Sequence, residues 1–226
     1  MPDTIRQPLR QRNRQVARDV VLDAAERLLR KSATAEFSMR ALAAEAGVGF
    51  ATPFNHFGNK NAIMQALSSR LIERMASRFS ERASAGDAID RVLAMGQISV
   101  ELLLEQPNVY KVVVGSLGVV SPVPSAVRKQ SEGLWLLALG DFAGIAAEAI
   151  DVARAVLSQQ LAFAFRGCLS FWIADELDDA LLASAFETCA SVTLLGFADP
   201  ERRPYLLERI TESRMLRNRQ SADSSG

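Results

Sequence analysis

The sequence predicts an all-α protein, with a small N-terminal helical domain followed by a larger helical body. Ala, Leu, Glu and Arg are abundant, and apolar residues recur at helical spacing in nearly every segment. No segment shows the sustained apolar–polar alternation that is typical of strands. The chain has 226 residues, of which 49% are hydrophobic, so it can bury a substantial core.

The N-terminal part contains four expected helices. The first covers residues 14–31, where apolar side chains recur at helical spacing. Two basic residues stand at its end, and cations stabilise the C-terminus of a helix. Ser38 offers an N-cap to a short second helix that ends before Gly47. A third short helix is expected over residues 50–57, and a fourth from Asn59 to about residue 82.

The body is expected to be a bundle of further helices behind a joint at residues 84–87. They are predicted near 88–105, 108–115, 126–147, 151–174 and 179–197, with a last charged helix over 201–219. Residues 115–125 hold Gly, Pro and Ser and are predicted to form a loop. Residues 221–226 are expected to be disordered.

Charge is unevenly distributed, although the chain as a whole carries 26 basic and 26 acidic residues. Residues 1–60 contain ten Lys or Arg and six Asp or Glu, whereas residues 61–198 contain ten and fifteen. The first part is therefore positive and the second negative. A positive N-terminal part followed by a negative part is expected of a protein whose N-terminal domain binds DNA. The attraction to phosphates must be confined to that domain if it is to orient the protein on DNA.

Residues 37–60, FSMRALAAEAGVGFATPFNHFGNK, form a helix-turn-helix pattern. Ala43 and Ala46 are small enough to let two helices cross closely, and Gly47 can take the positive φ of a tight turn. In such a unit the second helix enters the major groove of DNA, while the first crosses the phosphates. The pattern therefore predicts a DNA-binding domain.

Three segments together resemble the TetR family of transcriptional regulators: AAERLLR at 24–30, FSMRALAAEAGV at 37–48 and ATPFNHFGNKNAI at 51–63. The resemblance covers about residues 14–70. It implies a symmetric dimer in which the last two long helices of each subunit form a four-helix interface, with an effector cavity inside each body. Two apolar stripes are compatible with that interface: Leu157, Leu161, Phe165 and Cys168, and Leu182, Phe186, Cys189 and Leu194.

The resemblance also indicates the DNA contacts, with departures from the family pattern. Phe54 stands where the family often has a phosphate-contacting Tyr, and Gly49 replaces the usual Ser or Thr that caps the reading helix. Lys60 is expected to bind phosphate, because backbone N–H groups at a helix start already favour an anion. The full expected set is Ser38, Arg40, Gly49, Phe50, Thr52, Pro53, Phe54, Asn55, His56 and Lys60.

A basic arm precedes these helices. Arg6, Arg10, Arg12, Arg14 and Arg18 either grip adjacent phosphates or the minor groove, or form a solvated tail.

The apolar body is expected to bind a small-molecule effector that is largely hydrophobic, although core packing would produce the same composition. The candidate ligand-binding residues are Trp135, Phe142, Phe163, Arg166 and Trp172. Arg166 interrupts the apolar run LAFAFRGCLSFW. It should therefore reach solvent, pair with another group, or meet a polar or anionic effector.

The sequence predicts no catalytic, metal or cofactor site. His56 is the only histidine and has no nearby Cys or clustered carboxylates. The acidic cluster at residues 175–179 suits a solvated loop between two long helices. Cys168 and Cys189 lie in apolar helical stretches and are expected to be reduced thiols, and the sequence leaves open whether either has a redox role.

Neither secretion nor membrane spanning is indicated, so a cytoplasmic protein is expected. The start, MPDTIRQPLRQRNRQ, has no apolar segment, and no run of eighteen apolar residues occurs in the sequence.

These observations predict a dimeric, sequence-specific DNA-binding regulator, a ligand-responsive repressor acting on a palindromic operator. The expected division is an arm at 1–13, a helix-turn-helix domain at 14–60, a connecting helix at 61–83, an effector-binding and dimerisation domain at 84–200, and a charged, partly disordered extension at 201–226. One alternative is a helical interaction module that has lost DNA binding, which retained duplex binding would exclude. The other is a helical enzyme, which a turnover screen would reveal.

Overall fold

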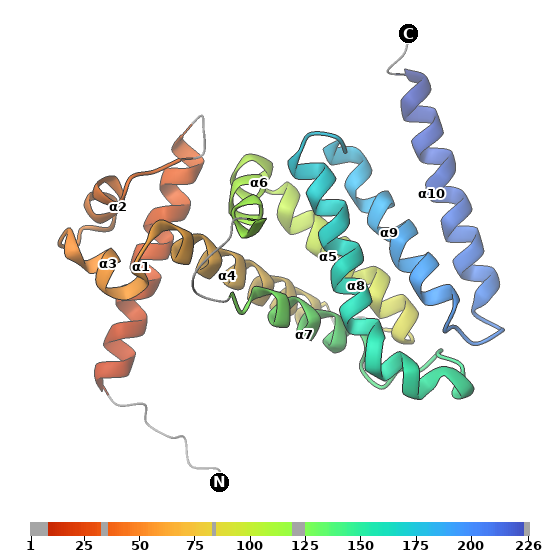
Figure 1. Ribbon diagram of the computed structural model, residues 1–226. Coiled ribbons are helices and arrows are strands. Elements are labelled where there is room, and N and C mark those ends of the chain that lie inside the picture. The colour runs from red at the N-terminus through yellow and green to blue at the C-terminus, as the bar shows by residue number, and fades with distance from the viewer. Residues whose placement is uncertain (1–8, 33–35, 83–84, 119–124, 224–226) are drawn as a thin grey trace.

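The computed structural model describes residues 9–32, 36–82, 85–118 and 125–223. These residues are almost entirely helical, which confirms the predicted all-α class (Figure 1). Within these ranges the only pairing of extended backbone is one isolated bridge between Ile145 and Ala198. No helix in the described part of the chain is both long and apolar enough to cross a membrane.

The N-terminal domain packs three helices at one end of the molecule (Figure 1). They are α1 (Leu9–Lys31), α2 (Met39–Ala46) and α3 (Ala51–Phe57). Val21, Leu29, Leu42 and Ile63 are almost fully buried and form the centre of this small core. The first helix begins at Leu9 and not at residue 14, so residues 9–13 of the expected arm are helical. Residues 1–8 lie outside the described residues.

A long fourth helix, α4 (Lys60–Glu81), leads from this domain into the body (Figure 1). Its Arg70 pairs with three carboxylates of α1, at 3.2 Å from Asp19, 2.5 Å from Asp23 and 3.5 Å from Glu26. Burial alone would lower the pKa of the Arg70 guanidinium, but the three carboxylates raise it overall. The position of α4 relative to α1 is therefore fixed by charge as well as by packing.

Three more arginines follow at intervals of four residues and tie α4 to the body. Arg74 and Arg78 both pair with Glu105, at 3.3 and 2.6 Å, and Arg82 pairs with Glu101 at 2.8 Å. Arg74 also donates a hydrogen bond of 2.7 Å to the hydroxyl of Tyr110. We call Arg70, Arg74, Arg78 and Arg82 the arginine row.

The body is a bundle that surrounds the far end of α4. Its helices are α5 (Ala88–Leu104), α6 (Pro107–Gly115), α7 (Val127–Leu139), α8 (Ile150–Ile173), α9 (Asp179–Leu195) and α10 (Arg203–Asp223), with short 3-10 turns at Ser116–Gly118 and Ala147–Ala149. The predicted helix over 126–147 was too long. It ends at Leu139 because Gly140, Phe142 and Gly144 have φ values of 55°, 65° and 83°, which no α-helix accepts.

The predicted dimer stripes face the core of the subunit itself. Leu157, Leu161, Phe165 and Cys168 of α8 are at most 6% exposed, and so are Leu182, Phe186 and Leu194 of α9. They contribute to the body core together with Trp135, whose ring centroid lies 4.9 Å from that of Phe186. Of the residues predicted for the interface, Cys189 is the one on the surface. The seven buried residues therefore belong to the subunit's own core and are not available for the interface with which their spacing is compatible.

The last helix, α10, packs along α9 at the end of the molecule opposite α1–α3 (Figure 1). Just before its start, Arg202 pairs with Asp87 at 2.8 Å and Asp90 at 2.6 Å. The charged helix expected over 201–219 is therefore present. It continues to Asp223, so residues 221–223 are helical and not disordered as predicted, while 224–226 lie outside the described residues.

A glycine at the crossing of α5 and α9 makes a sharp test of this packing. A Cβ on Gly96 would lie 2.2 Å from the Phe186 ring, whereas a Cβ on Gly133 of α7 would meet nothing within 4 Å. Gly96→Ala should therefore lower the free energy of unfolding by about 1–3 kcal/mol.

The matched variant Gly133→Ala should raise the free energy of unfolding by about 0.5–1 kcal/mol, because alanine favours a helix interior. Urea unfolding followed by circular dichroism measures both. Equal effects of the two substitutions would contradict the described crossing of α5 and α9.

Candidate nucleic-acid interface and an internal cavity

The turn between α2 and α3 has the geometry that the sequence predicted. The Oγ of Ser38 accepts a hydrogen bond of 3.1 Å from the N–H of Ala41 and caps α2. Gly47 ends α2 with a φ of 65°, and the N–H of Val48 returns to the carbonyl of Ala43 at 3.0 Å. These local bonds fix the direction in which α3 leaves the turn.

α3 presents two aromatic rings to solvent. Phe50 is 58% exposed and Phe54 is 39% exposed, and their ring centroids lie 5.4 Å apart in an edge-on arrangement. Gly49 and Asn55 are exposed and Thr52 is partly buried. Large apolar side chains at such exposure on a short helix leave an apolar surface without an intramolecular partner among the described residues.

Two of the predicted DNA contacts are turned at least partly inward. Pro53 is buried in the domain, so it supports α3 from behind and is removed from the proposed contact set. His56 is partly buried, and its Nδ1 has no hydrogen-bond partner among the described residues. The carbonyl of His56 accepts a 2.6 Å hydrogen bond from Arg18, whose guanidinium lies 4.2 Å from the ring centroid of Phe57. Arg18 therefore fastens α1 to the end of α3.

The start of α4 brings Lys60 beside the same surface. The Oδ1 of Asn59 accepts a 2.8 Å hydrogen bond from the N–H of Ala62 and caps the helix. The Lys60 ammonium lies 5.0 Å from the ring centroid of Phe37, a cation–π contact that restrains the long side chain. Lys60 remains partly exposed, and Arg40 near the start of α2 is fully exposed.

Ion pairs balance several acidic side chains of the N-terminal domain and leave some of its basic side chains without an acidic partner. Asp19, Asp23 and Glu26 pair with Arg70, and Glu45 pairs with basic residues of α1, whose hydrogen bonds lower the pKa of its carboxyl. Among the described residues, Arg12, Arg14, Arg18, Arg40 and Lys60 have no acidic partner within 4 Å. The cations left uncompensated are thus those of the first turns of α1 and the starts of α2 and α4.

The expected basic arm is described only in part. Arg12 and Arg14 are exposed on the first turns of α1. Arg6 and the side chain of Arg10 lie outside the described residues.

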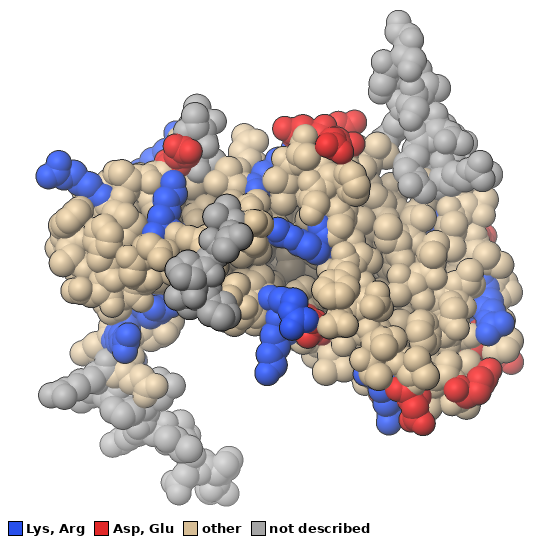
Figure 2. Space-filling view, in the orientation of Figure 1, with Lys and Arg blue, Asp and Glu red and all other residues tan. Residues whose placement is uncertain are grey.

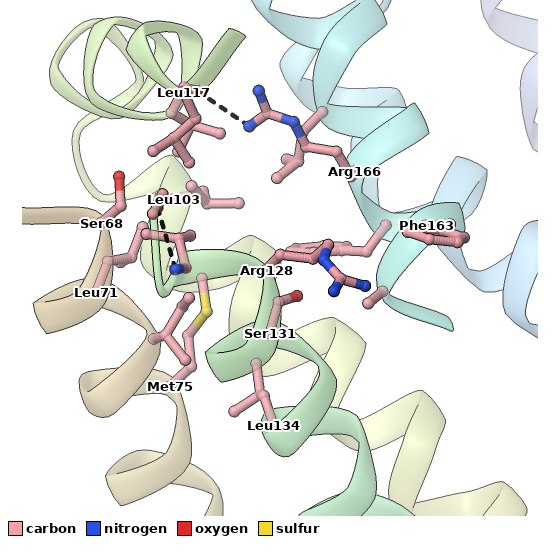
Figure 3. Close-up of a pocket in the computed structure, with 17 residues that line it drawn as sticks. Ser68, Leu71, Met75, Leu103, Leu117, Arg128, Ser131, Leu134, Phe163 and Arg166 are labelled. Carbon is pink, nitrogen blue, oxygen red and sulfur yellow. Dashed lines mark hydrogen bonds between the residues drawn. The ribbon is translucent and has the colours of Figure 1, made fainter. Parts of the chain in front are cut away.

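The body contains a cavity of about 280 Å³ between α4, α6, α7 and α8 (Figure 3). Apolar side chains form most of its wall, among them Leu71 and Met75 of α4, Leu103 of α5, and Leu134 of α7. Its polar lining consists of two arginines, Arg128 and Arg166, and three serines. The space-filling view shows a hollow in the middle of one face, with basic side chains on both sides of it (Figure 2).

Two of the five predicted ligand-binding residues line this cavity, namely Phe163 and Arg166. The other three do not line it. Trp135 and Trp172 are fully buried, and the indole N–H of Trp172 donates a 2.7 Å hydrogen bond to Asp179. Phe142 is 6% exposed in the bend after α7. These three rings belong to the core of the subunit.

The sequence interpretation missed the contribution of α4 to the cavity. Ser68, Leu71, Ile72 and Met75 all line it, at the i, i+3, i+4, i+7 spacing of one helical face. That spacing was visible in the sequence, but it does not distinguish a core face from a cavity wall. Arg128 lies in the predicted helix 126–147, where one basic residue on a helix gives no sign that it lines a cavity.

Two other candidate sites have ordinary structural explanations. In the acidic cluster, Asp175 pairs with Lys111 and Asp179 accepts from Trp172. Across the part of the chain that the structure describes, no group of three or more His, Cys, Asp or Glu is placed to hold a metal ion. The Sγ atoms of Cys168 and Cys189 lie 3.8 Å apart, and this contact, followed by burial, raises the pKa of Cys168.

Comparison with known proteins agrees with this geometry. Residues 21–67 match the family model for bacterial regulatory proteins of the tetR family. A TetR transcriptional regulator from Rhodococcus sp. RHA1 is 23% identical over 82% of this chain and 97% of its own, with a TM-score of 0.65. A protein of unknown function from the same organism is 20% identical over 88% of this chain and all of its own, with a TM-score of 0.51. No curated protein matches the sequence significantly.

The family match covers the end of α1, the helix-turn-helix and the start of α4, and the structural likeness extends the shared fold over most of the body. Residues 21–67 therefore carry the N-terminal, DNA-binding domain of the tetR family of bacterial regulatory proteins, and most of the chain shares its fold with a TetR transcriptional regulator.

Proposed function

We propose that the protein is a homodimeric, ligand-responsive repressor that reads a palindromic operator with α3. The observation that carries this proposal is the surface of α3. Phe50, Phe54 and Asn55 are exposed there, and the same domain carries cationic side chains that have no acidic partner among the described residues. Cations of this kind bind phosphates and position the domain, while the side chains of α3 meet the bases.

The chemistry of α3 favours A·T-rich half-sites. Residues 49–57 contain no Arg, Lys, Gln or Glu, so the side chains that most often read guanine or cytosine are missing from this segment. Asn55 suits adenine, with which an amide can form two hydrogen bonds. Phe50 and Phe54 suit the methyl group of thymine, because it is the one apolar group on a base edge.

The remaining predicted contacts take roles that fit their positions. Arg40 and Lys60 contact phosphates on either side of α3. Ser38 keeps a hydroxyl hydrogen to donate to a phosphate, because its oxygen is used as the cap acceptor. Thr52 and the exposed backbone at Gly49 lie near the groove, and His56 lies at its edge.

The dimer is proposed to form through the outer faces of α8 and α9. Phe163, Phe171 and Val192 are 49–56% exposed there, and Gly167 carries no side chain that would keep a second helix away. The 3.8 Å approach of Cys168 to Cys189 places the two helices side by side at this level. A four-helix contact between two subunits would cover these apolar residues.

The proposed ligand response works through α4. Its first residue lies beside the reading helix and its middle turns line the cavity, so a bound molecule and the operator act on one rigid element. A shift of a few Å in the spacing of two heads prevents both from docking at once. In this proposal residues 14–60 bind the operator, and residues 61–83 form the connecting helix. Residues 84–200 form the effector-binding and dimerisation domain.

A second candidate is a helical interaction module that has lost DNA binding. The exposed Phe50 and Phe54 rings favour it, because such rings also suit a protein surface. The two candidates differ in how binding responds to salt, since only contacts with phosphates release counterions.

The phosphate role of Lys60 is tested by Lys60→Met, which keeps a long unbranched side chain and removes the charge. We expect weaker binding to all duplexes and a plot of log affinity against log salt that is shallower by about one unit. Fluorescence anisotropy at several salt concentrations measures both effects.

The control for this test is Lys129→Met, which removes an exposed charge from α7 in the body. It should leave the slope unchanged. A slope that is the same for wild type and Lys60→Met would show that Lys60 does not touch phosphate.

The dimer face is tested by Phe171→Glu and Val192→Glu. A carboxylate buried at a two-fold contact has no partner, so each variant should raise the dimer dissociation constant by about 100-fold or more. Light scattering after size exclusion gives the mass. Leu207→Glu is the matched control, because Leu207 on α10 is 53% exposed and lies outside the proposed face. Equal behaviour of all three variants would contradict this face.

A further inference from the structure

We propose that the cavity binds an amphipathic organic anion, with the acidic head held by Arg166 and an apolar tail among the side chains of α4, α5 and α7. The inference deepens the proposed function, because it assigns a chemical class to the effector on which the ligand response rests.

The wall of the cavity is divided by polarity. Twelve of its seventeen lining residues are apolar, and the other five are Ser68, Ser125, Arg128, Ser131 and Arg166. None of the seventeen is acidic. An apolar wall with two cations and no anion matches a ligand that has an apolar body and a negative end.

The charge of Arg166 is uncompensated. Its guanidinium donates one hydrogen bond of 3.0 Å, to the carbonyl of Val114 at the end of α6, and no carboxylate of the described residues lies within 4 Å of it (Figure 3). The neighbouring segment 119–124 has the sequence VVSPVP and contains no acidic residue. The guanidinium has five N–H donors, so most of its capacity is available to a ligand.

Burial makes this cation receptive to an anion. Arg166 is partly buried, and the partial loss of water around its guanidinium lowers the pKa of that group. A bound acid would supply the missing charge through two parallel hydrogen bonds to the planar guanidinium. A neutral or cationic molecule of the same shape would leave the charge of Arg166 uncompensated.

The second arginine of the wall differs in this respect. Arg128 pairs with Glu132 at 2.7 Å and its side chain is 66% exposed. Its charge is therefore already balanced and largely solvated. In the proposal, Arg166 binds the head group and Arg128 lies at the mouth of the cavity. Substitution of Arg128 is therefore a matched control for substitution of Arg166.

The volume limits the length of the tail. The volume of about 280 Å³ lies just below the roughly 300–1,000 Å³ that small-molecule sites occupy. A saturated fatty acid of medium length, such as decanoate, is therefore a suitable probe, and 1-decanol is its neutral counterpart with the same tail.

The experiment compares decanoate and 1-decanol by titration calorimetry on the full chain, below the critical micelle concentration of decanoate and the solubility limit of 1-decanol. Wild type should bind decanoate at least ten times more tightly than 1-decanol. Arg166→Leu should remove this preference, Arg166→Lys should keep part of it, and Arg128→Leu should keep most of it. Circular dichroism spectra and melting curves verify that each variant is folded.

Equal affinity of wild type for the two probes, or no binding of decanoate, would overturn the proposal without any variant. Unchanged decanoate binding by folded Arg166→Leu would overturn the role of that residue. Operator binding is measured separately, with and without decanoate. If decanoate binds through Arg166 but leaves operator affinity unchanged, the anion site stands and the ligand response fails.

Discussion

The arginine row on α4 holds the two halves of the molecule in one arrangement. Arg70 binds three carboxylates of α1, while Arg74, Arg78 and Arg82 bind Glu105 and Glu101 of the body. A helix fixed by packing alone can slide along its neighbours, but ion pairs at every turn specify one register. Each pair is partly exposed and contributes little by itself, so the effect lies in their number and direction. The row therefore sets the position of the N-terminal domain, which carries α3, relative to the body.

The cavity lies on another face of the same helix. Ser68, Leu71, Ile72 and Met75 alternate along α4 with the arginines that bind α1 and the body. A ligand that fills the cavity therefore presses on the element that carries Lys60 and supports α3. Arg166 reaches this cavity from α8, the helix whose outer face is proposed as the dimer contact. The proposed effector, partner subunit and operator would therefore all act on α4 and α8.

Local sequence signals predicted the N-terminal domain well. Ser38, Gly47 and Asn59 act through bonds to residues at most four positions away, and each cap was found where the residue type indicated it. Periodicity told less about the body, because an apolar stripe on a helix does not reveal what covers it. The stripes on α8 and α9 face the subunit's own core. Trp135 and Trp172 were predicted to bind a ligand but lie in the core, because an aromatic residue in a sequence likewise does not reveal whether it faces a core or a cavity. The early end of α7 depends on φ values that only the fold determines.

The central claim is that α3 reads a defined sequence as part of a two-fold dimer. Selection of duplexes from a random library by the purified protein at moderate salt tests it most directly, since neither operator nor effector need be known. We expect a two-fold symmetric site with A·T-rich half-sites about one helical turn apart. Recovery of no common sequence, with only weak and salt-sensitive binding, would contradict it and favour the interaction module.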